Sequence, residues 1–380
     1  MDRSLGWSAL LRPFERFLAT EARSAVVLFV AAAVALGMAN SGFSKFYAGL
    51  WTSELGSLSV LEWINDFWMA GFFVLVGLEI KRELLVGELN TWRKAALPLV
   101  AAIGGMIAPA LVYLAFAGKT APSGWGVPMA TDIAFALGGA RLLGARVPSA
   151  LLVFLTAFAI ADDLGAVAVI AFFYGHAVHG IGWVALGVAA LVGMNRVGVS
   201  KGGWYLLAGL PLWLAVHASG LHATLAGVAV GLSVPLSVKE ASPLAELEHG
   251  LHPFVAYGVL PLFAFANAGV DLRGGISVFD PITLGIAGGL VIGKPVGILL
   301  ASGVAVGLGI AELPANVRWS HLAGAAILGG IGFTMSLFVA LLAFDPSQLL
   351  QAKVGILAGS GLAAVLGWAV LSWATGSKRS

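Results

Sequence analysis

Residues 150–173, ALLVFLTAFAIADDLGAVAVIAFF, form an apolar run of membrane-spanning length that nevertheless carries two adjacent carboxyls, Asp162 and Asp163. A transmembrane helix needs about 20 mostly apolar residues. An aspartate at its centre costs about 2.5 to 3.5 kcal/mol on insertion scales, so such residues usually face a polar cavity and handle ions or protons. Neighbouring helical residues point about 100° apart. One carboxyl can therefore face a partner helix while the other faces a cavity.

The composition of the whole chain is that of a polytopic membrane protein. Of its 380 residues, 59% are hydrophobic and only 11% are charged, against about 25% in an ordinary soluble domain. The net charge of +2 and the scattered histidines give no reason to expect a nucleic-acid partner. Because the chain has no cysteine, disulfides, thiolate chemistry and cysteine metal sites are excluded.

Twelve apolar stretches have lengths that suit bilayer spans. Their approximate bounds are 24–41, 58–80, 95–117, 124–143, 149–174, 181–195, 203–217, 221–236, 253–270, 282–309, 319–343 and 354–374. The three that start at 181, 203 and 221 are short, and a pair of them is compatible with a re-entrant segment. We therefore predict an all-α fold with one transmembrane domain over 24–374. An amphipathic segment over 1–23 precedes it, and a cytoplasmic tail over 375–380 follows it.

The distribution of basic residues supports this count. With the N-terminus inside, sixteen of the 21 Lys and Arg residues fall in cytoplasmic segments, four fall in outer loops, and Lys294 lies within a span. This excess follows the positive-inside rule and predicts that both termini are cytoplasmic. The outer loop 42–59 contains TSELGSLSV, whose alternation around Gly56 predicts either a small hairpin or a coil.

Two of the predicted spans are interrupted near their middle. In 124–143 the interruption is Pro128, Thr131 and Asp132, and in 319–343 it is the glycine-rich GGIG at 329–332, which weakens a helix. These spans lie in the middle of two three-span blocks, 95–174 and 282–374. Corresponding interruptions in two halves point to an inverted-repeat transporter with an ion site at the midplane.

The residue types at these interruptions predict a site where a cation and protons compete. If both helices break and cross, Asp132 can offset the positive half-helix ends and Lys294 the negative ones. A hard monovalent cation needs oxygen ligands, which Asp163, Thr131 and freed carbonyls would supply. Alternating access to this site would give exchange. If Asp162, Asp163 and Lys294 titrate as a coupled group, more than one proton can leave for one cation, which makes the exchange electrogenic.

Several of these features have a structural alternative. Asp162 and Lys294 could form only a structural salt bridge. The glycines that recur every four residues over 285–297 favour helix packing over ion contact. Thr131 could bond to the backbone of its own helix.

Two other functions are compatible with buried acids. A cation channel could conduct through an acid-lined cavity, but crossed broken helices favour alternating access. A membrane aspartyl protease could use Asp132 and Asp163 as its dyad. Lys294 argues against this, because a nearby cation would keep both acids ionised instead of letting them share a proton.

Titratable residues gather at the predicted inner ends of two spans. They are Glu79, Lys81, Arg82 and Glu83 in GLEIKREL, and Glu248, His249 and His252 in LEHGLHP. Placed together, they would form an entrance cluster in which histidine responds near neutral pH. The alternative is an ordinary solvated rim.

Nine motifs, in order through nearly the whole chain, resemble those of the bacterial sodium/proton antiporters of the NhaA type. They are WIND (63–66), GLEIKREL (77–84), AAIGGMIAPAL (101–111), ATDIAFALG (130–138), AIADDLGA (159–166), HATLAGV (222–228), LPLFAFANAGV (260–270), IGKPVGI (292–298) and GGIGFTMS (329–336). The resemblance implies twelve helices, two of them discontinuous and crossed. It also implies exchange of Na+, and of Li+ at the same site, for H+ across the bacterial inner membrane. Neither a cofactor nor an enzymatic activity is implied.

The resemblance also assigns roles to particular residues. Asp163 is similar to the family's principal cation ligand, Asp162 to a proton carrier paired with Lys294, and Asp132 to a dipole-balancing acid beside Thr131. Asp66 resembles an acid on the outer side, and the loop 42–59 resembles a dimer contact. The pH-responsive inner cluster corresponds to Glu79, Arg82, Glu83, Glu248, His249 and His252.

The chain departs from the family pattern at one place. Leu244-Ala245-Glu246 stand where better-known members carry basic residues before LEH. The inner funnel of this chain is therefore expected to be more negative, which leaves open the pH at which it becomes active.

Overall fold

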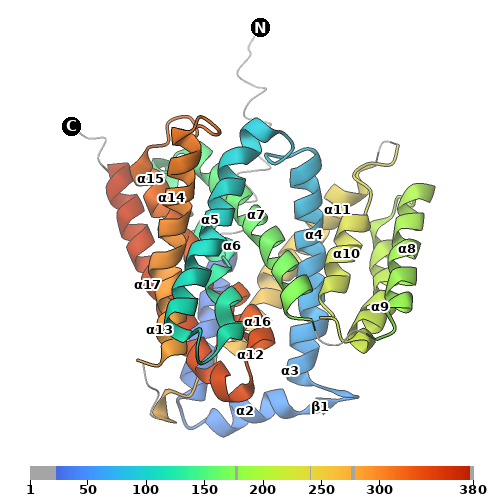
Figure 1. The fold of residues 1–380 in the computed structure, drawn as a ribbon. Coiled ribbons are helices and arrows are strands. Elements are labelled where there is room, and N and C mark those ends of the chain that lie inside the picture. Colours follow the sequence, from blue (N-terminus) through green and yellow to red (C-terminus); the bar gives the residue numbers. More distant parts are fainter. Residues whose placement is uncertain (1–22, 176–178, 240, 275–278, 377–380) are drawn as a thin grey trace.

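The fold was obtained as a computed structural model, which describes residues 23–175, 179–239, 241–274 and 279–376. Residues 1–22 of the predicted amphipathic segment and residues 377–380 of the predicted tail lie outside the described residues. The described part is almost wholly helical (Figure 1), and its sheet structure consists of one two-stranded hairpin and one isolated bridge. The predicted all-α class is therefore confirmed.

Six described helices are long and apolar enough to cross a membrane. Three of them are single helices: α5 (Trp92–Ala117), α7 (Ser149–Phe173) and α17 (Pro346–Gly376). The other three are composite. Val60–Leu85 includes α4 (Met69–Leu85); Pro243–Asn267 comprises α11 (Pro243–Phe254), η4 (Val255–Val259) and α12 (Leu260–Asn267); and Pro281–Gly307 comprises α13 (Pro281–Gly288), η6 (Gly289–Gly293) and α14 (Lys294–Gly307). Two bent pairs raise the number to as many as eight. They are Arg23–Ala39 (the first helix) with α2 (Ser44–Thr52), bent by 113°, and α15 (Trp319–Gly329) with α16 (Phe333–Ala343), bent by 44°.

The other four predicted spans also coincide with helical segments, but these are shorter. They are η2 (Pro122–Met129) with α6 (Ile133–Arg141), then α8 (Ile181–Val197), α9 (Gly202–Ser219) and α10 (Leu225–Ser233). These elements have 8 to 18 residues each. Length and composition therefore support six to eight spans among the described helices, fewer than the twelve predicted.

The helices form two groups with α7 between them (Figure 1). Helices α5, α13, α14, α15 and α17 pack on one another, as do α4, α8, α9, α10 and α11, while α7 contacts both α5 and α4. Asp162 and Asp163 lie on α7. Their position in the chain therefore places them between the two groups.

Glycine allows the closest helix contacts. A Cβ built on Gly297 of α14 would lie 2.1 Å from the carbonyl oxygen of Gly104 of α5, and a Cβ on Gly227 of α10 would lie 2.1 Å from that of Ala70 of α4. Only glycine permits such backbone contact, as is common in membrane helix pairs. The glycines over 285–297 thus serve helix packing, as the structural alternative predicted.

Of the two alternatives for the loop 42–59, a hairpin or a coil, the structure has the hairpin. Strand β1 (Glu54–Leu55) pairs antiparallel with β2 (Leu58–Ser59), so that Glu54 faces Ser59. Gly56 opens the turn with φ +74°, which other residues adopt only with strain. Figure 1 shows the hairpin at the lower edge of the molecule, beside α2 and α3 (Val60–Glu62).

Candidate functional site

The two interrupted spans break at the predicted residues and meet there. Helix α6 starts after an extended stretch at Ala130–Asp132, and α15 ends at Gly329 before α16 starts at Phe333. The Asp132 backbone N–H donates to the carbonyl oxygen of Ile331 at 2.7 Å. The backbone of one break therefore binds that of the other.

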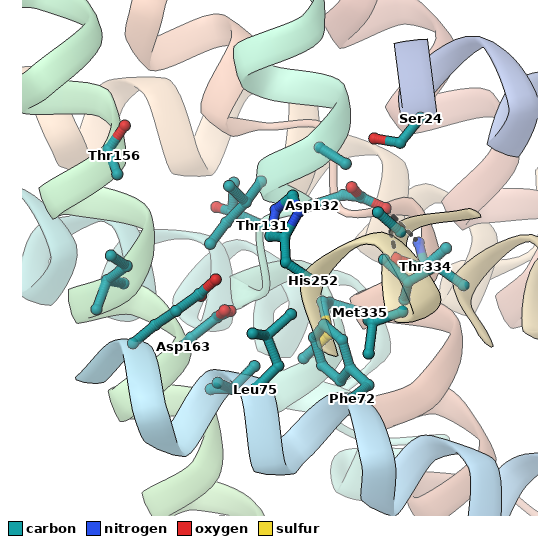
Figure 2. Close-up of a pocket in the computed structure, with 18 of the residues that line it drawn as sticks. Ser24, Phe72, Leu75, Thr131, Asp132, Thr156, Asp163, His252, Thr334 and Met335 are labelled. Atoms are coloured by element: carbon teal, nitrogen blue, oxygen red, sulfur yellow. Dashed lines mark hydrogen bonds between the residues drawn. The ribbon is translucent and has the colours of Figure 1, made fainter. Parts of the chain in front are cut away.

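The Asp132 carboxylate caps two half-helices at once. As N-cap of α6, it accepts a hydrogen bond from the backbone N–H of Phe135 at 3.2 Å. Its other oxygen accepts from the N–H of Thr334 at 3.2 Å and from the Thr334 hydroxyl at 2.5 Å, at the start of α16 (Figure 2). A carboxylate at a helix N-terminus satisfies free N–H groups and offsets the positive dipole end. The structure thus places Asp132 at two positive ends.

Lys294 lies at a negative end. Its ammonium donates to the carbonyl oxygen of Met129, the last residue of η2, and to the Asp162 carboxylate at 2.7 Å. Both charged side chains are fully buried. The π-helical segment η6 ends immediately before Lys294. The next residue, Pro295, has no N–H to donate, so the regular helical bonding is already interrupted where the wider turn occurs.

Asp163 points into a small pocket (Figure 2). Its side chain is buried, and its Oδ1 atom accepts no hydrogen bond from any described residue. The pocket has a volume of about 60 Å³ and is also lined by Thr131 and Asp132. One water needs about 10 to 15 Å³ of such space, so the pocket has room for a few waters or a small ion. Asp162 turns to Lys294 and Asp163 to the pocket, as the angle between helical neighbours predicted.

Thr131 bonds across the break instead of to its own helix. Its hydroxyl donates to the carbonyl oxygen of Gly329, the last residue of α15, at 2.9 Å. The alternative of a bond to its own backbone is therefore wrong. This bond holds the Thr131 hydroxyl at the edge of the pocket. Because the bond uses only the hydroxyl hydrogen, the lone pairs of the oxygen remain free to coordinate a cation.

The same pocket extends from Asp163 to the predicted inner end of α4. Beyond Phe72 and Leu75 its walls include Glu79, Arg82 and His252. Figure 2 labels Phe72, Leu75 and His252 on these walls. The site and the predicted entrance cluster therefore share one cavity.

Most of the predicted inner cluster is brought together. Arg82 contacts Glu83 at 2.8 Å and both carboxylate oxygens of Glu248 at 3.1 Å. Glu79 lies within electrostatic range of Arg82, and His252 within range of Glu248. The cluster thus links α4 to α11 through charged groups.

Two residues of the same motifs lie apart from it. His249 is exposed and takes part in none of these contacts within the described chain. Lys81 turns to α10, where its ammonium donates to the carbonyl oxygens of Leu232 and Val234 at 2.8 and 2.6 Å. Lys81 therefore caps the C-terminal end of α10.

Asp66 lies at the opposite end of the Val60–Leu85 span and does not line the pocket. It belongs to the π-helical segment η1 (Trp63–Trp68), and its carboxylate is 3.8 Å from Nδ1 of His217 on α9. Trp213 stacks on His217 at 5.4 Å and donates its indole N–H to the Asp66 carbonyl oxygen at 3.3 Å. The structure thus joins Asp66 to α9.

The sequence did not single out Thr334 or His217 as partners of Asp132 and Asp66. Thr334 belongs to a noted motif, FTMS, which marked its position but not its partner. Trp213 and His217 have the four-residue spacing of helical neighbours. That spacing was the only available signal, and it says nothing about Asp66.

Comparison with known proteins agrees with the motifs. The sequence model of one protein family, Na+/H+ antiporter 1, matches residues 15–371. The chain belongs to this family. Relatives named Na+/H+ antiporter NhaA are similar over almost their whole length. That of Mesorhizobium japonicum is 52% identical over 373 residues, 94% of each chain. That of Rhizorhabdus wittichii is 52% identical over 367 residues, 95% of this chain and 98% of the relative. That of Yersinia enterocolitica is 50% identical over 385 residues, 96% of this chain and 98% of the relative.

Family membership confirms the resemblance predicted from the nine motifs. Because the family and these relatives are named as antiporters, the chain is a transporter and not an enzyme. Its apolar helices make it a multi-pass membrane protein.

Proposed function

We propose that this chain exchanges Na+ for H+ across a bacterial inner membrane, with Asp163 as the principal cation ligand. The observation that carries the proposal is the buried Asp163 carboxylate, whose Oδ1 accepts no hydrogen bond from the described residues and faces a pocket of ion size. Thr131 and Asp132 supply further oxygens on the same pocket. A small hard cation prefers such oxygen ligands, so Li+ would bind there as well.

Asp162 is the proposed proton carrier. In the ionised form it pairs with Lys294 at 2.7 Å, and a proton on Asp162 would release Lys294 to its remaining partner, the Met129 carbonyl oxygen. Asp162 and Asp163 are adjacent and both interact with Lys294, so their protons would leave as a coupled set. One Na+ could then displace more than one H+, which makes the exchange electrogenic. The scheme needs no cofactor besides the transported cation and protons.

Exchange requires that the site open to each side in turn. The pocket runs from Asp163 to Glu79 and Arg82. The distribution of basic residues assigns the Glu79 and Arg82 end of the pocket, and both chain termini, to the cytoplasmic side. We propose twelve spans with inverted repeats over 95–174 and 282–374 and with the broken helices crossed at the midplane. Relative movement of the two helix groups beside α7 would then open the opposite side.

The inner cluster is the proposed pH-responsive element. Protonation of His252 adds positive charge beside the Arg82 and Glu248 pair, whose contact links α4 to α11. Glu246 adds negative charge at the start of α11. The cluster of this chain should therefore retain protons to a higher pH than one flanked by basic residues.

The outer hairpin is the proposed contact of a homodimer in the lipid bilayer. The two strands pair only with each other among the described residues. An unpaired strand edge is a template for pairing with another chain. Leu55, 63% exposed, would be covered by the second copy.

Proteoliposomes with an acid interior test the proposal. Adding Na+ outside should collapse the proton gradient with the unmodified chain and fail to do so with Asp163→Asn. The matched control is Asp271→Asn, which removes an exposed carboxyl remote from the pocket and should leave exchange intact. K+ should have no effect on any of the three. If Asp163→Asn exchanges as well as the unmodified chain, the ligand assignment is wrong. Sodium current without proton movement would favour a cation channel.

A further inference from the structure

A second pocket lies at the helix breaks and shares no lining residue with the pocket of Asp163. It has a volume of about 320 Å³ and is enclosed on one side by the first helix, from Phe29 to Leu36, and on the other by α17, from Leu357 to Ala364. Ile331 and Phe333, which flank the break between α15 and α16, also line it, together with Phe135 of α6. It therefore reaches both broken spans.

The chemistry of the walls excludes an ionic or strongly polar occupant. The only polar side chain on them is that of Ser360, whose hydroxyl oxygen accepts a hydrogen bond from the N–H of Phe333 at 3.1 Å. The other lining residues are aliphatic, aromatic or glycine. An engineered apolar cavity of about 150 Å³ binds benzene. A pocket of twice that size accommodates a segment of hydrocarbon chain.

The depth of the pocket identifies the source of that hydrocarbon. Phe29 to Leu36 is the middle of the first helix, and Leu357 to Ala364 is the middle of α17. Each stretch rises about 10 Å along its helix. At the rim, Phe29 and Gly361 are exposed. In a membrane-spanning chain, exposed residues at mid-span face the hydrocarbon interior, which head groups do not reach.

We propose that this pocket binds the acyl tail of a bilayer phospholipid at the junction of the two broken helices. The tail contacts Ile331, whose carbonyl oxygen accepts the bond from Asp132 N–H, and Phe333, whose ring packs edge-on against Phe135 at 5.3 Å. It thus supports from the lipid side the breaks that position the Asp132 carboxylate. Binding does not depend on the exchange function proposed above.

Photo-crosslinking with a tail-labelled phospholipid tests this proposal. The full chain is reconstituted in phosphatidylethanolamine and phosphatidylglycerol vesicles that contain a phospholipid with a diazirine near the end of one acyl chain, and labelled peptides are located by mass spectrometry. Labelling should concentrate on the pocket stretches of the first helix and α17. It should exceed labelling at Leu300 and Val304, which are 65% and 61% exposed on α14 but line neither pocket.

Two variants make the test specific. Ala364→Phe fills the pocket and should reduce labelling there several-fold. Val365→Phe places the same aromatic side chain at the next position, outside the pocket and 68% exposed, and should not reduce it. If Ala364→Phe does not fold, Ala33→Phe fills the pocket from the opposite wall. Labelling no stronger than on α14, or unchanged in the filled variant, would overturn the proposal. The proposal would also be overturned if the chain's own residues 1–22 cover the pocket and keep the lipid probe from labelling it.

Discussion

Removal of the Asp132 carboxylate should uncap two helices, and the cost can be estimated from its contacts. Asp132→Ala deletes the N-cap bond to Phe135 N–H and both bonds to Thr334. Loss of an N-cap costs about 1 kcal/mol. A hydrogen bond to a charged group contributes about 1.5 to 3 kcal/mol. The bonds lost therefore amount to about 4 to 7 kcal/mol, reduced by the desolvation free energy that is recovered when a buried charge is removed.

A double-mutant cycle with Thr334→Val measures one of these hydrogen bonds separately from the free energy that is recovered when the buried charge is removed. The valine keeps the backbone N–H of residue 334 and removes only the hydroxyl, which is 2.5 Å from the Asp132 carboxylate. In the unmodified chain, Thr334→Val should cost about 1.5 to 3 kcal/mol. In the Asp132→Ala background the hydroxyl has already lost this acceptor, so the same change should cost nearly nothing. Terms that belong to Asp132 alone cancel in the cycle.

The free energy of unfolding can be measured by reversible titration from dodecyl maltoside micelles into sodium dodecyl sulfate, followed by the fluorescence of the 12 tryptophans. The matched control is Thr156→Val. Thr156 lines the same pocket but donates to Leu152 of its own helix at 3.0 Å. Its effect should therefore add to that of Asp132→Ala. If Thr334→Val costs the same in both backgrounds, Asp132 does not cap α16 in the way the structure shows.

Three further changes have expected outcomes. Lys81→Met should lower the free energy of unfolding by about 1 to 2 kcal/mol, because it frees the carbonyl oxygens at the end of α10, and Lys81→Arg should restore most of it in the same titration. Gly297→Ala should destabilise the chain by about 1 to 3 kcal/mol or more, because the added methyl group would lie 2.1 Å from a backbone oxygen of α5. Gly303→Ala on the same helix places its methyl group in open space and should be neutral or stabilising. Equal melting temperatures for the two alanine variants would contradict this packing. Gly56→Val should disrupt the hairpin turn, which needs φ +74°. Light scattering should then show that the proposed homodimer dissociates to monomers, and an unchanged mass would mean that the hairpin is not the dimer contact.

Composition and local pattern were sufficient to predict the membrane class and the two broken spans, and for the loop 42–59 they left a hairpin and a coil as alternatives. These features depend on interactions within one segment. An apolar run of bilayer length inserts as a helix, a glycine cluster such as 329–332 or a proline such as Pro128 interrupts it, and Gly56 permits the turn. The count of twelve spans exceeds what helix length alone supports, because elements such as α10 have only 9 residues.

The partners of the buried polar groups depend on the tertiary structure, because they are distant in the chain. Thr131 bonds to a residue 198 positions away, and Asp132 to Thr334, 202 positions away. The sequence marked Lys81 and Arg82 as members of one cluster. The helical turn between them sends Lys81 to α10 and Arg82 to Glu248. Residue types and spacing identify which groups need a partner once they are buried, but only the packing of separate helices decides which partner each one meets.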